Sequence, residues 1–204
     1  RLYCRIFKGD AVKKLHHLLM IICLLTLAAC SSRQQPDNTN WRQQREKLES
    51  VTHWTISGKL AIITAEKKGS TRIRWQQNGD DYDLNLTSLL GTRVMEMHKT
   101  GNQVLIIDDQ GREYRGVDAE TLVYRLTGWQ MPVSQLPVWI KGLPGNTDYE
   151  INPNGQVTRI KTDDWQMQYQ TYQPIDGWMM PEKVTFKGPR TELRLVISDW
   201  EIAK

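Results

Sequence analysis

The stretch WTISGKLAI, residues 54–62, alternates apolar and mostly polar side chains with a period of two. Two further segments, residues 72–75 and 81–86, repeat this alternation, with charged or amide residues on one side and Ile, Trp, Tyr or Leu on the other. Successive side chains of a β-strand point to opposite faces of the sheet, so the period predicts strands with one buried face. One-sided burial is typical of antiparallel sheets.

Short segments rich in Gly and Asn separate the predicted strands, as expected of hairpin turns. They are Asn78-Gly79-Asp80, Thr100-Gly101-Asn102, Asp109-Gln110-Gly111 and Asn152-Pro153-Asn154-Gly155. Further strands are predicted at residues 93–98, 103–108, 112–116, 149–152, 156–162, 164–172, 182–187 and 192–200. The pattern therefore predicts a mainly β domain built around one long antiparallel sheet.

Three segments depart from the β pattern and predict short helices. Residues 41–51 place apolar side chains at 41, 48 and 51 among charged ones. Asp118 is positioned to cap a second helix that Gly128 ends, and Ser134 to cap a third that ends at Gly142. We expect these helices to cover one face of a strongly curved sheet.

The first 29 residues have the organisation of an export signal. Lys13 and Lys14 precede an uncharged run over residues 18–29, which suits a signal-peptide core and is too short to span a bilayer. The run ends in Leu27-Ala28-Ala29-Cys30, which resembles the lipobox of bacterial lipoproteins. The alternatives are a plain secretory signal cut elsewhere and a short uncleaved anchor.

The lipobox resemblance implies a division of the chain into three parts. Residues 1–29 are expected to be a lipoprotein signal peptide, and the chain is expected to carry a diacylglycerol and an N-acyl group on Cys30. Residues 30–40 are polar and predict a lipidated flexible tether, and residues 41–204 form a single domain. Ser31 follows the Cys; Asp at that position usually marks inner-membrane retention, so Ser31 predicts the periplasmic face of the outer membrane of a Gram-negative bacterium.

The positive charge of the chain, formally +4, is concentrated in the leader. Its ionic residues are Arg1, Arg5, Lys8, Asp10, Lys13 and Lys14, so the remainder of the chain is neutral. A nucleic-acid binder needs clustered cations to displace counterions from phosphates, and we therefore expect no nucleic-acid partner. The composition, 39% hydrophobic and 25% charged residues, argues against disorder and against a protein with many membrane spans.

Motifs of catalytic chemistry are missing from the chain after the leader. There is no His/Cys metal spacing, no Gly-x-Ser-x-Gly elbow and no phosphate loop, and no thiol beyond Cys30. Asp80, Asp81 and Asp83 resemble part of a calcium loop but lack its Gly and distal Glu, so a solvated hairpin is favoured. We therefore expect that the protein is not an enzyme, and that it binds no metal and no cofactor apart from the covalent lipid on Cys30.

Residues 87–91, Thr-Ser-Leu-Leu-Gly, place two leucines where a turn between strands should be polar. In one interpretation Leu89 and Leu90 fold back onto the edge of the sheet. In the other they are exposed, and two exposed Leu side chains would contribute roughly 3–5 kcal/mol on entering hydrocarbon. We therefore predict a membrane-insertion loop formed by Leu89, Leu90 and Gly91.

The apolar faces of the predicted strands and helices are compatible with two arrangements. Either the helices and the sheet bury a solid core together, or the helices are a lid over an open apolar cavity that binds lipid. Met and Trp side chains suit either arrangement. Periodicity does not distinguish the two.

Taken together, these motifs resemble the LolB family of outer-membrane lipoprotein receptors over essentially the whole chain after the leader. Beside the lipobox, the resemblance rests on Trp41-Arg42-Gln43, Trp75-Gln76-Gln77, Leu86-Thr87-Ser88-Leu89-Leu90-Gly91, Leu126-Thr127-Gly128 and Trp139-Ile140-Lys141-Gly142-Leu143-Pro144-Gly145. One departure lies in the loop, which in the family typically contains Asn-Pro-Leu-Gly. Losing the Pro should loosen this turn, and Leu90 matches the family's membrane-probing Leu.

The resemblance implies an incomplete, half-open antiparallel β-barrel, covered by a lid of about three short helices and enclosing an apolar cavity. It implies a receptor, here expected to be a monomer, that accepts triacylated lipoproteins from the periplasmic carrier LolA and inserts them into the outer membrane without ATP. The candidate acyl-cavity residues are Ile73, Trp75, Leu84, Leu86, Met95, Met97, Leu136, Trp139 and Ile140. Two other interpretations stay open: a lipoprotein scaffold of an envelope assembly, and a periplasmic lipid-binding protein without a carrier partner.

Overall fold

The computed structural model describes residues 39–203. The predicted signal peptide, Cys30 and most of the predicted tether lie outside these residues. In chain order the elements are α2 (Thr39–Ser50), β1 (His53–Thr64), β2 (Lys68–Asn78), β3 (Asp81–Thr87), β4 (Arg93–Thr100), β5 (Gln103–Asp108), β6 (Glu113–Gly116), α3 (Ala119–Thr127), the 3-10 helix η1 (Val133–Gln135), α4 (Leu136–Trp139), β7 (Asp148–Ile151), β8 (Val157–Lys161), β9 (Gln166–Ile175), β10 (Trp178–Lys187) and β11 (Thr191–Ile202). No helix within this part of the chain is long and apolar enough to cross a membrane.

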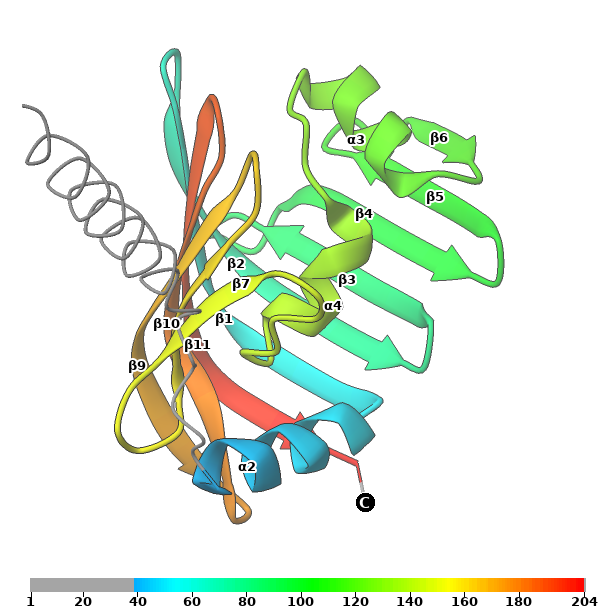
Figure 1. Ribbon diagram of the computed structural model, residues 1–204. Coiled ribbons are helices and arrows are strands. Elements are labelled where there is room, and N and C mark those ends of the chain that lie inside the picture. Colours follow the sequence, from blue (N-terminus) through cyan, green and yellow to red (C-terminus); the bar gives the residue numbers. More distant parts are fainter. Residues whose placement is uncertain (1–38, 204) are drawn as a thin grey trace, which may run out of the picture. The chain divides into compact units, whose positions relative to one another are not determined.

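The strands form a single antiparallel sheet in the order β6-β5-β4-β3-β2-β1-β11-β10-β9-β8-β7. Strands β1 and β11, from opposite ends of the domain, pair in the middle, with Leu60 opposite Leu195. The sheet stays open, with β6 and β7 at its two edges, and α3, η1 and α4 connect these edges. Figure 1 shows the strands as one curved layer with α3 and α4 over one face. The predicted open antiparallel sheet with short covering helices is confirmed.

The period of two determines which face of the sheet is buried. In β2, Thr71, Ile73 and Trp75 are buried on the face that the helices cover, here called the inner face. Arg72 and Arg74, between them, are exposed on the outer face. The alternation therefore predicted both the strand and its orientation.

A bulge in β11 at Ser198, which has no register partner in β1, helps to bend the sheet where the two ends of the domain meet. The register between β1 and β11 shifts at Ser57 and Gly58. A Cβ atom at Gly58 would lie 2.2 Å from the carbonyl oxygen of Val196, so only glycine fits. Bulges of this kind increase local twist and bend the strand.

The predicted caps of α3 are confirmed. The Asp118 carboxylate accepts hydrogen bonds from the backbone N–H groups of Glu120 and Thr121. Gly128 ends the helix in the left-handed region, at φ 73°, and its N–H donates to the carbonyl of Tyr124. Both ends of α3 are therefore determined by local sequence.

The predicted cap of the third helix is wrong. Ser134 lies inside η1, and neither η1 nor α4 has a side-chain cap. The backbone N–H of Ser134 donates instead to Glu120 Oε1 at 2.8 Å. A side chain from α3 thus bonds to the backbone of this segment, which splits into two single turns, η1 and α4.

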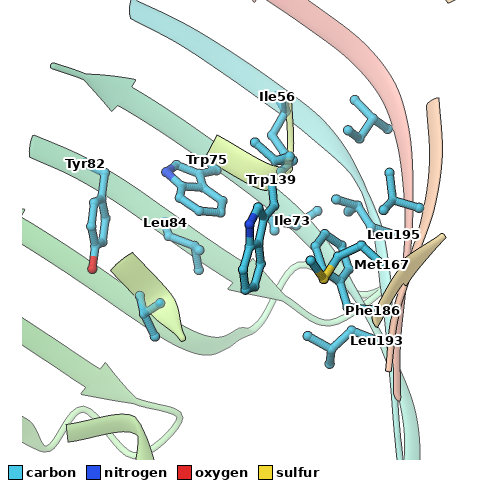
Figure 2. Close-up of a cluster of buried hydrophobic side chains, with 14 of the residues drawn as sticks. Ile56, Ile73, Trp75, Tyr82, Leu84, Trp139, Met167, Phe186, Leu193 and Leu195 are labelled. Carbon is cyan, nitrogen blue, oxygen red and sulfur yellow. The ribbon is translucent and has the colours of Figure 1, made fainter. Parts of the chain in front are cut away.

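A row of aromatic rings fills one part of the inner face. The ring centroids of Trp200 and Trp54 lie 5.5 Å apart, those of Trp54 and Trp75 5.3 Å, and those of Trp75 and Tyr82 5.9 Å. Trp75 Nε1 donates to the side chain of Gln77 at 3.0 Å. Rings at this spacing and tilt add stabilisation beyond that of buried area, so the row holds together this part of the inner face. Trp75 and Tyr82 appear in Figure 2.

Candidate functional site

A pocket of about 620 Å³ lies beside the aromatic row, between the inner face of the sheet and the covering helices. Its lining is dominated by apolar side chains, several of which Figure 2 shows pointing into the same region. The apolar lining comprises Leu60, Ile62, Ile73, Trp75, Leu84, Leu86, Val94, Met95, Met97, Ile106, Val123, Leu126, Trp129, Met131, Val133, Leu136, Ile140, Phe186, Leu193 and Leu195. Small-molecule sites typically have about 300–1,000 Å³. The inner face of the sheet is therefore partly hollow.

A second hollow, a surface groove of about 820 Å³, has different chemistry. Most of the residues that line it are polar or charged, among them Glu120, Arg125, Gln130, Asp163 and Asp164. Its larger volume therefore does not make it the better lipid site. The apolar pocket is the candidate for hydrocarbon.

Eight of the nine side chains predicted for the cavity line the apolar pocket: Ile73, Trp75, Leu84, Leu86, Met95, Met97, Leu136 and Ile140. The ninth, Trp139, lines the surface groove instead and is 2% exposed. Leu136 and Ile140 are four residues apart and share one side of the helical turn, and the Trp139 side chain belongs to the buried core cluster. Trp139 is thus the one predicted cavity residue that is not among those lining the apolar pocket.

The sequence prediction missed the contribution of the other half of the sheet. Phe186 of β10, Leu193 and Leu195 of β11, and Leu60 of β1 all line the pocket. Each lies in a segment whose alternation predicted a strand. What sequence did not reveal is that β11 lies beside β1, because that pairing joins residues far apart in the chain.

Charged and polar side chains lie at one side of the apolar pocket. Arg112 Nε donates to Asp108 Oδ2 at 2.7 Å, and the Tyr114 hydroxyl donates to the same oxygen at 3.1 Å. Partial burial of Asp108 opposes its charged form, but hydrogen bonds from Arg112, Gln110 and Tyr114 together lower its pKa. Asp108 is therefore charged at neutral pH, and since Arg112 is exposed, this cluster marks the solvent side of the pocket.

Two polar contacts join the covering helices to one another. Lys141, which follows α4, donates through Nζ to the carbonyls of Leu48 at 3.0 Å and Val51 at 2.7 Å. These carbonyls belong to the end of α2, and burial lowers the pKa of Lys141, partly offset by the charge of Glu49. The second contact is the bond from Ser134 to Glu120, which joins η1 to α3. Specific bonds thus join α3 to η1, and the segment after α4 to the end of α2.

The loop between β3 and β4 exposes both of its leucines. Leu89 is 57% exposed and Leu90 95%, so they do not fold back onto the sheet edge. Ser88 Oγ accepts hydrogen bonds from the N–H groups of Leu90 at 3.3 Å and Thr92 at 3.2 Å. Gly91 turns the chain at φ 86°, and its N–H donates to the Ser88 carbonyl at 3.0 Å. These bonds replace the rigidity expected of the missing Pro.

Within residues 39–203 no group of three or more His, Cys, Asp or Glu side chains is arranged to hold a metal ion. Asp81 Oδ1 accepts from the N–H of Gly101 at 2.7 Å, and Asp83 Oδ1 contacts His98 Nδ1 at 2.5 Å. The acidic residues of this hairpin are therefore engaged in turn and cross-strand contacts. The apolar pocket and the leucine loop are the two features with a distinct chemistry.

Comparison with known sequences gives a consistent result. A family model described as Outer membrane lipoprotein LolB matches residues 52–200. The outer-membrane lipoprotein LolB of Tolumonas auensis is 81% identical over 194 residues, which cover 95% of this chain and the whole of that relative. The protein of the same name from Aeromonas salmonicida is 46% identical over 89% of this chain and 94% of its own length.

Solved structures share the fold at low sequence identity. A LolA superfamily protein from Nitrosomonas europaea superposes with a TM-score of 0.52 at 9% identity, covering 80% of this chain and 93% of that one. A putative outer-membrane lipoprotein-sorting protein domain from Vibrio parahaemolyticus gives 0.51 at 10% identity, covering 80% and 91%. These likenesses show that the curved sheet with covering helices is an architecture found in other chains.

Proposed function

The chain belongs to the LolB family of outer-membrane lipoproteins, which supports a receptor role in the Lol pathway, and we propose that it receives the acyl chains of lipoproteins in the apolar pocket. In this proposal a LolA-type periplasmic carrier delivers the cargo. The receptor, a monomer held by lipidated Cys30 at the periplasmic face of the outer membrane, then passes the cargo into that membrane. The observation that carries the proposal is a pocket of about 620 Å³ with an apolar interior and a charged rim.

The need for a receptor follows from the free energy of exposed hydrocarbon. Each methylene moved from water into an apolar environment gains about 0.8 kcal/mol. Three acyl chains would therefore cross water extremely slowly without protection. A transfer from one apolar pocket to another avoids that exposure.

The pocket suits acyl chains because few of its groups require a polar partner. Its walls are mainly Leu, Ile, Val, Met and aromatic side chains. Met95 and Met97 are flexible and polarisable, and such side chains adapt to ligands of irregular shape. The Asp108–Arg112 pair at the rim can face the polar ester and amide groups where the acyl chains join the cargo.

Delivery requires no enzymatic step in this proposal. The sequence contains no nucleotide-binding motif, so transfer runs downhill from carrier to receptor to bilayer, without ATP. The receptor then needs an affinity for acyl chains between those of the carrier and the membrane. The exposed Leu90 supplies the contact with the bilayer, because burying a Leu side chain is worth roughly 1.5–3 kcal/mol.

The test uses a purified LolA-type carrier loaded with a triacylated lipoprotein, the present protein, and liposomes. We expect the cargo to move from carrier to protein, and then to sediment with liposomes in the absence of nucleotide. Displacement of a fluorescent fatty acid from the protein provides a second measurement of the same pocket. A protein that binds neither the fatty acid nor the cargo is a scaffold, and one that binds the fatty acid but takes nothing from the carrier is a lipid-binding protein of another kind.

A further inference from the structure

The outer face of the sheet carries cations that the proposed function does not use. Strand register places Lys59 of β1 directly opposite Arg72 of β2. On its other side Lys59 is opposite Val196 of β11, which is in turn opposite Lys183 of β10. Lys59, Arg72 and Lys183 are exposed, and we refer to these three residues as the cationic row.

The cationic row has no internal counter-charge. Some basic side chains of the sheet are paired with acids, as in Arg93 with Glu96 at 2.8 Å and Arg194 with Glu192 at 2.5 Å. No residue of the row forms an ion pair with any other residue in the described range 39–203. Like charges directly opposite each other on neighbouring strands destabilise the strand pair. The pairing of Lys59 with Arg72 therefore lowers the stability of the sheet.

The cationic row leads directly to the leucine loop. Arg72 is opposite Thr87, the last residue of β3, and Thr87 is opposite Arg93, the first residue of β4. The loop of residues 88–92 joins these two positions. The same register line across the sheet therefore contains the base of the exposed Leu90 loop and, further along, the cationic row.

Together, the loop and the row combine the two interactions that hold a protein at a charged bilayer. Leu90, at 95% exposure, is an apolar group available to enter hydrocarbon. Val196, at 39% exposure, adds apolar surface between Lys59 and Lys183. Lys and Arg close to a membrane surface are attracted by anionic lipid headgroups.

We propose that the cationic row binds the headgroups of anionic phospholipids, so that the outer face of β2, β1, β11 and β10 meets the membrane while Leu90 enters it. This inference rests on the proposed function, because it takes the leucine loop as a membrane contact. It adds an orientation, since the face opposite the apolar pocket is turned to the lipid. It also adds a lipid class, because only negatively charged headgroups complement three unpaired cations.

The first experiment uses the protein isolated from membranes with its own anchor, reconstituted in phosphatidylcholine vesicles with or without phosphatidylglycerol. An amine-reactive ester modifies exposed lysines, and mass spectrometry follows each site. We expect Lys59 and Lys183 to react several-fold more slowly in the anionic vesicles, and to recover in high salt, which screens such contacts. Lys47, exposed on α2, is the internal control and should react equally in both. Equal reactivity of Lys59 and Lys183 in the two kinds of vesicle overturns the inference.

The second experiment removes the charges. The triple variant Lys59→Gln/Arg72→Gln/Lys183→Gln should take cargo from the carrier as the wild type does, and deliver it several-fold more slowly into anionic vesicles. The matched control Lys47→Gln should deliver at the wild-type rate. Wild-type delivery by the triple variant overturns the inference and leaves the proposed function intact.

Two further outcomes separate the possibilities. Protection of Lys59 and Lys183 that appears only when the carrier is added, and also in neutral vesicles, shows that the row binds an acidic protein surface and overturns the lipid assignment. A wild-type protein that takes no cargo refutes the proposed function. Protection of Lys59 and Lys183 in anionic vesicles would still support lipid binding by the cationic row, and its absence would overturn it.

Discussion

The hydroxyl oxygens of Ser88 and Thr92 lie 2.6 Å apart and close the loop that carries Leu90. The backbone reinforces this closure, because the N–H of Ser88 donates to the carbonyl of Thr92 at 2.8 Å. A nearly fully exposed leucine is thus held on a loop with a defined conformation. Such a loop loses less conformational entropy when its tip is buried in another phase.

We expect Ser88→Ala to loosen this loop without unfolding the domain. The change removes the acceptor of the Leu90 and Thr92 N–H groups. An exposed bond of this kind contributes roughly 0.5–1.5 kcal/mol, so the free energy of unfolding should fall by about 1 kcal/mol or less. Hydrogen exchange at Leu90 and Thr92 should accelerate. Ser70→Ala, an exposed position on β2, is the control, and unchanged exchange in the loop of Ser88→Ala contradicts the assignment.

Leu90→Glu should separate acceptance from delivery. The side chain is 95% exposed, so the substitution leaves the fold and the pocket intact. Losing roughly 1.5–3 kcal/mol of Leu burial and adding a charge should reduce transfer into liposomes at least about tenfold, since a factor of ten corresponds to about 1.4 kcal/mol. Transfer from loaded carrier to protein should not change. Leu90→Met retains apolar surface and should deliver normally, and normal delivery by Leu90→Glu would remove the loop from the mechanism.

Met95→Trp should obstruct the apolar pocket. Met95 is half-buried and lines it, so a larger ring at this position occupies space proposed for hydrocarbon. We expect weaker binding of a fluorescent fatty acid and slower acceptance of cargo, with little change in delivery once cargo is bound. Tyr124→Trp adds the same ring at an exposed position outside this pocket and serves as the control. Unchanged fatty-acid affinity in Met95→Trp places the acyl chains elsewhere.

Lys141→Met should detach the end of α2 from the segment that follows α4. The variant keeps most of the side-chain volume but leaves the Val51 carbonyl without its donor, while the Leu48 carbonyl keeps the N–H of Val51. An unsatisfied buried acceptor costs roughly 1–3 kcal/mol, and we expect the free energy of unfolding in denaturant to fall by about that amount. Lys47→Met, on the exposed side of α2, should change it little.

The same residue predicts a pH dependence. Because burial lowers the pKa of Lys141 below 10.5, the unfolded chain binds a proton more readily than the folded one between the lowered value and 10.5. The contribution of this group to the free energy of unfolding therefore rises with pH across that window. The stability difference between wild type and Lys141→Met should grow over the same range, and a difference independent of pH argues that Lys141 is solvated in the folded state.

A chain lacking residues 1–30 should accept cargo at the wild-type rate. All residues that line the apolar pocket lie between positions 60 and 195, so the proposed anchor at Cys30 contributes placement rather than binding. The measurement is transfer from loaded carrier in solution. Failure of a folded, shortened chain to accept cargo would show that the anchor or the tether takes part in binding.

Much of the local structure could be predicted from sequence because it depends on neighbouring residues. The alternation in β2 determined both the strand and its buried face, and Asp118 and Gly128 determined the ends of α3. The same reasoning failed at Ser134, where a partner 14 residues away, Glu120, satisfies the backbone donor. Local rules are reliable where the interacting groups are neighbours in the chain, and weaker where tertiary partners compete.

The sequence by itself therefore determined which residues turn their side chains to the inside, and that Leu89 and Leu90 occupy a turn. Only the tertiary structure decided that the inside is partly hollow, that β11 supplies Leu193 and Leu195 to the hollow, and that Trp139 is not among the residues lining it. The physical reason is that periodicity reports only the direction of a side chain. The size of a cavity depends on the distance between the sheet and the helices, and long-range strand pairing and a few helix contacts determine that distance. The alignment of Lys59, Arg72 and Lys183 arises in the same way, because strand register, not sequence proximity, brings them into one row.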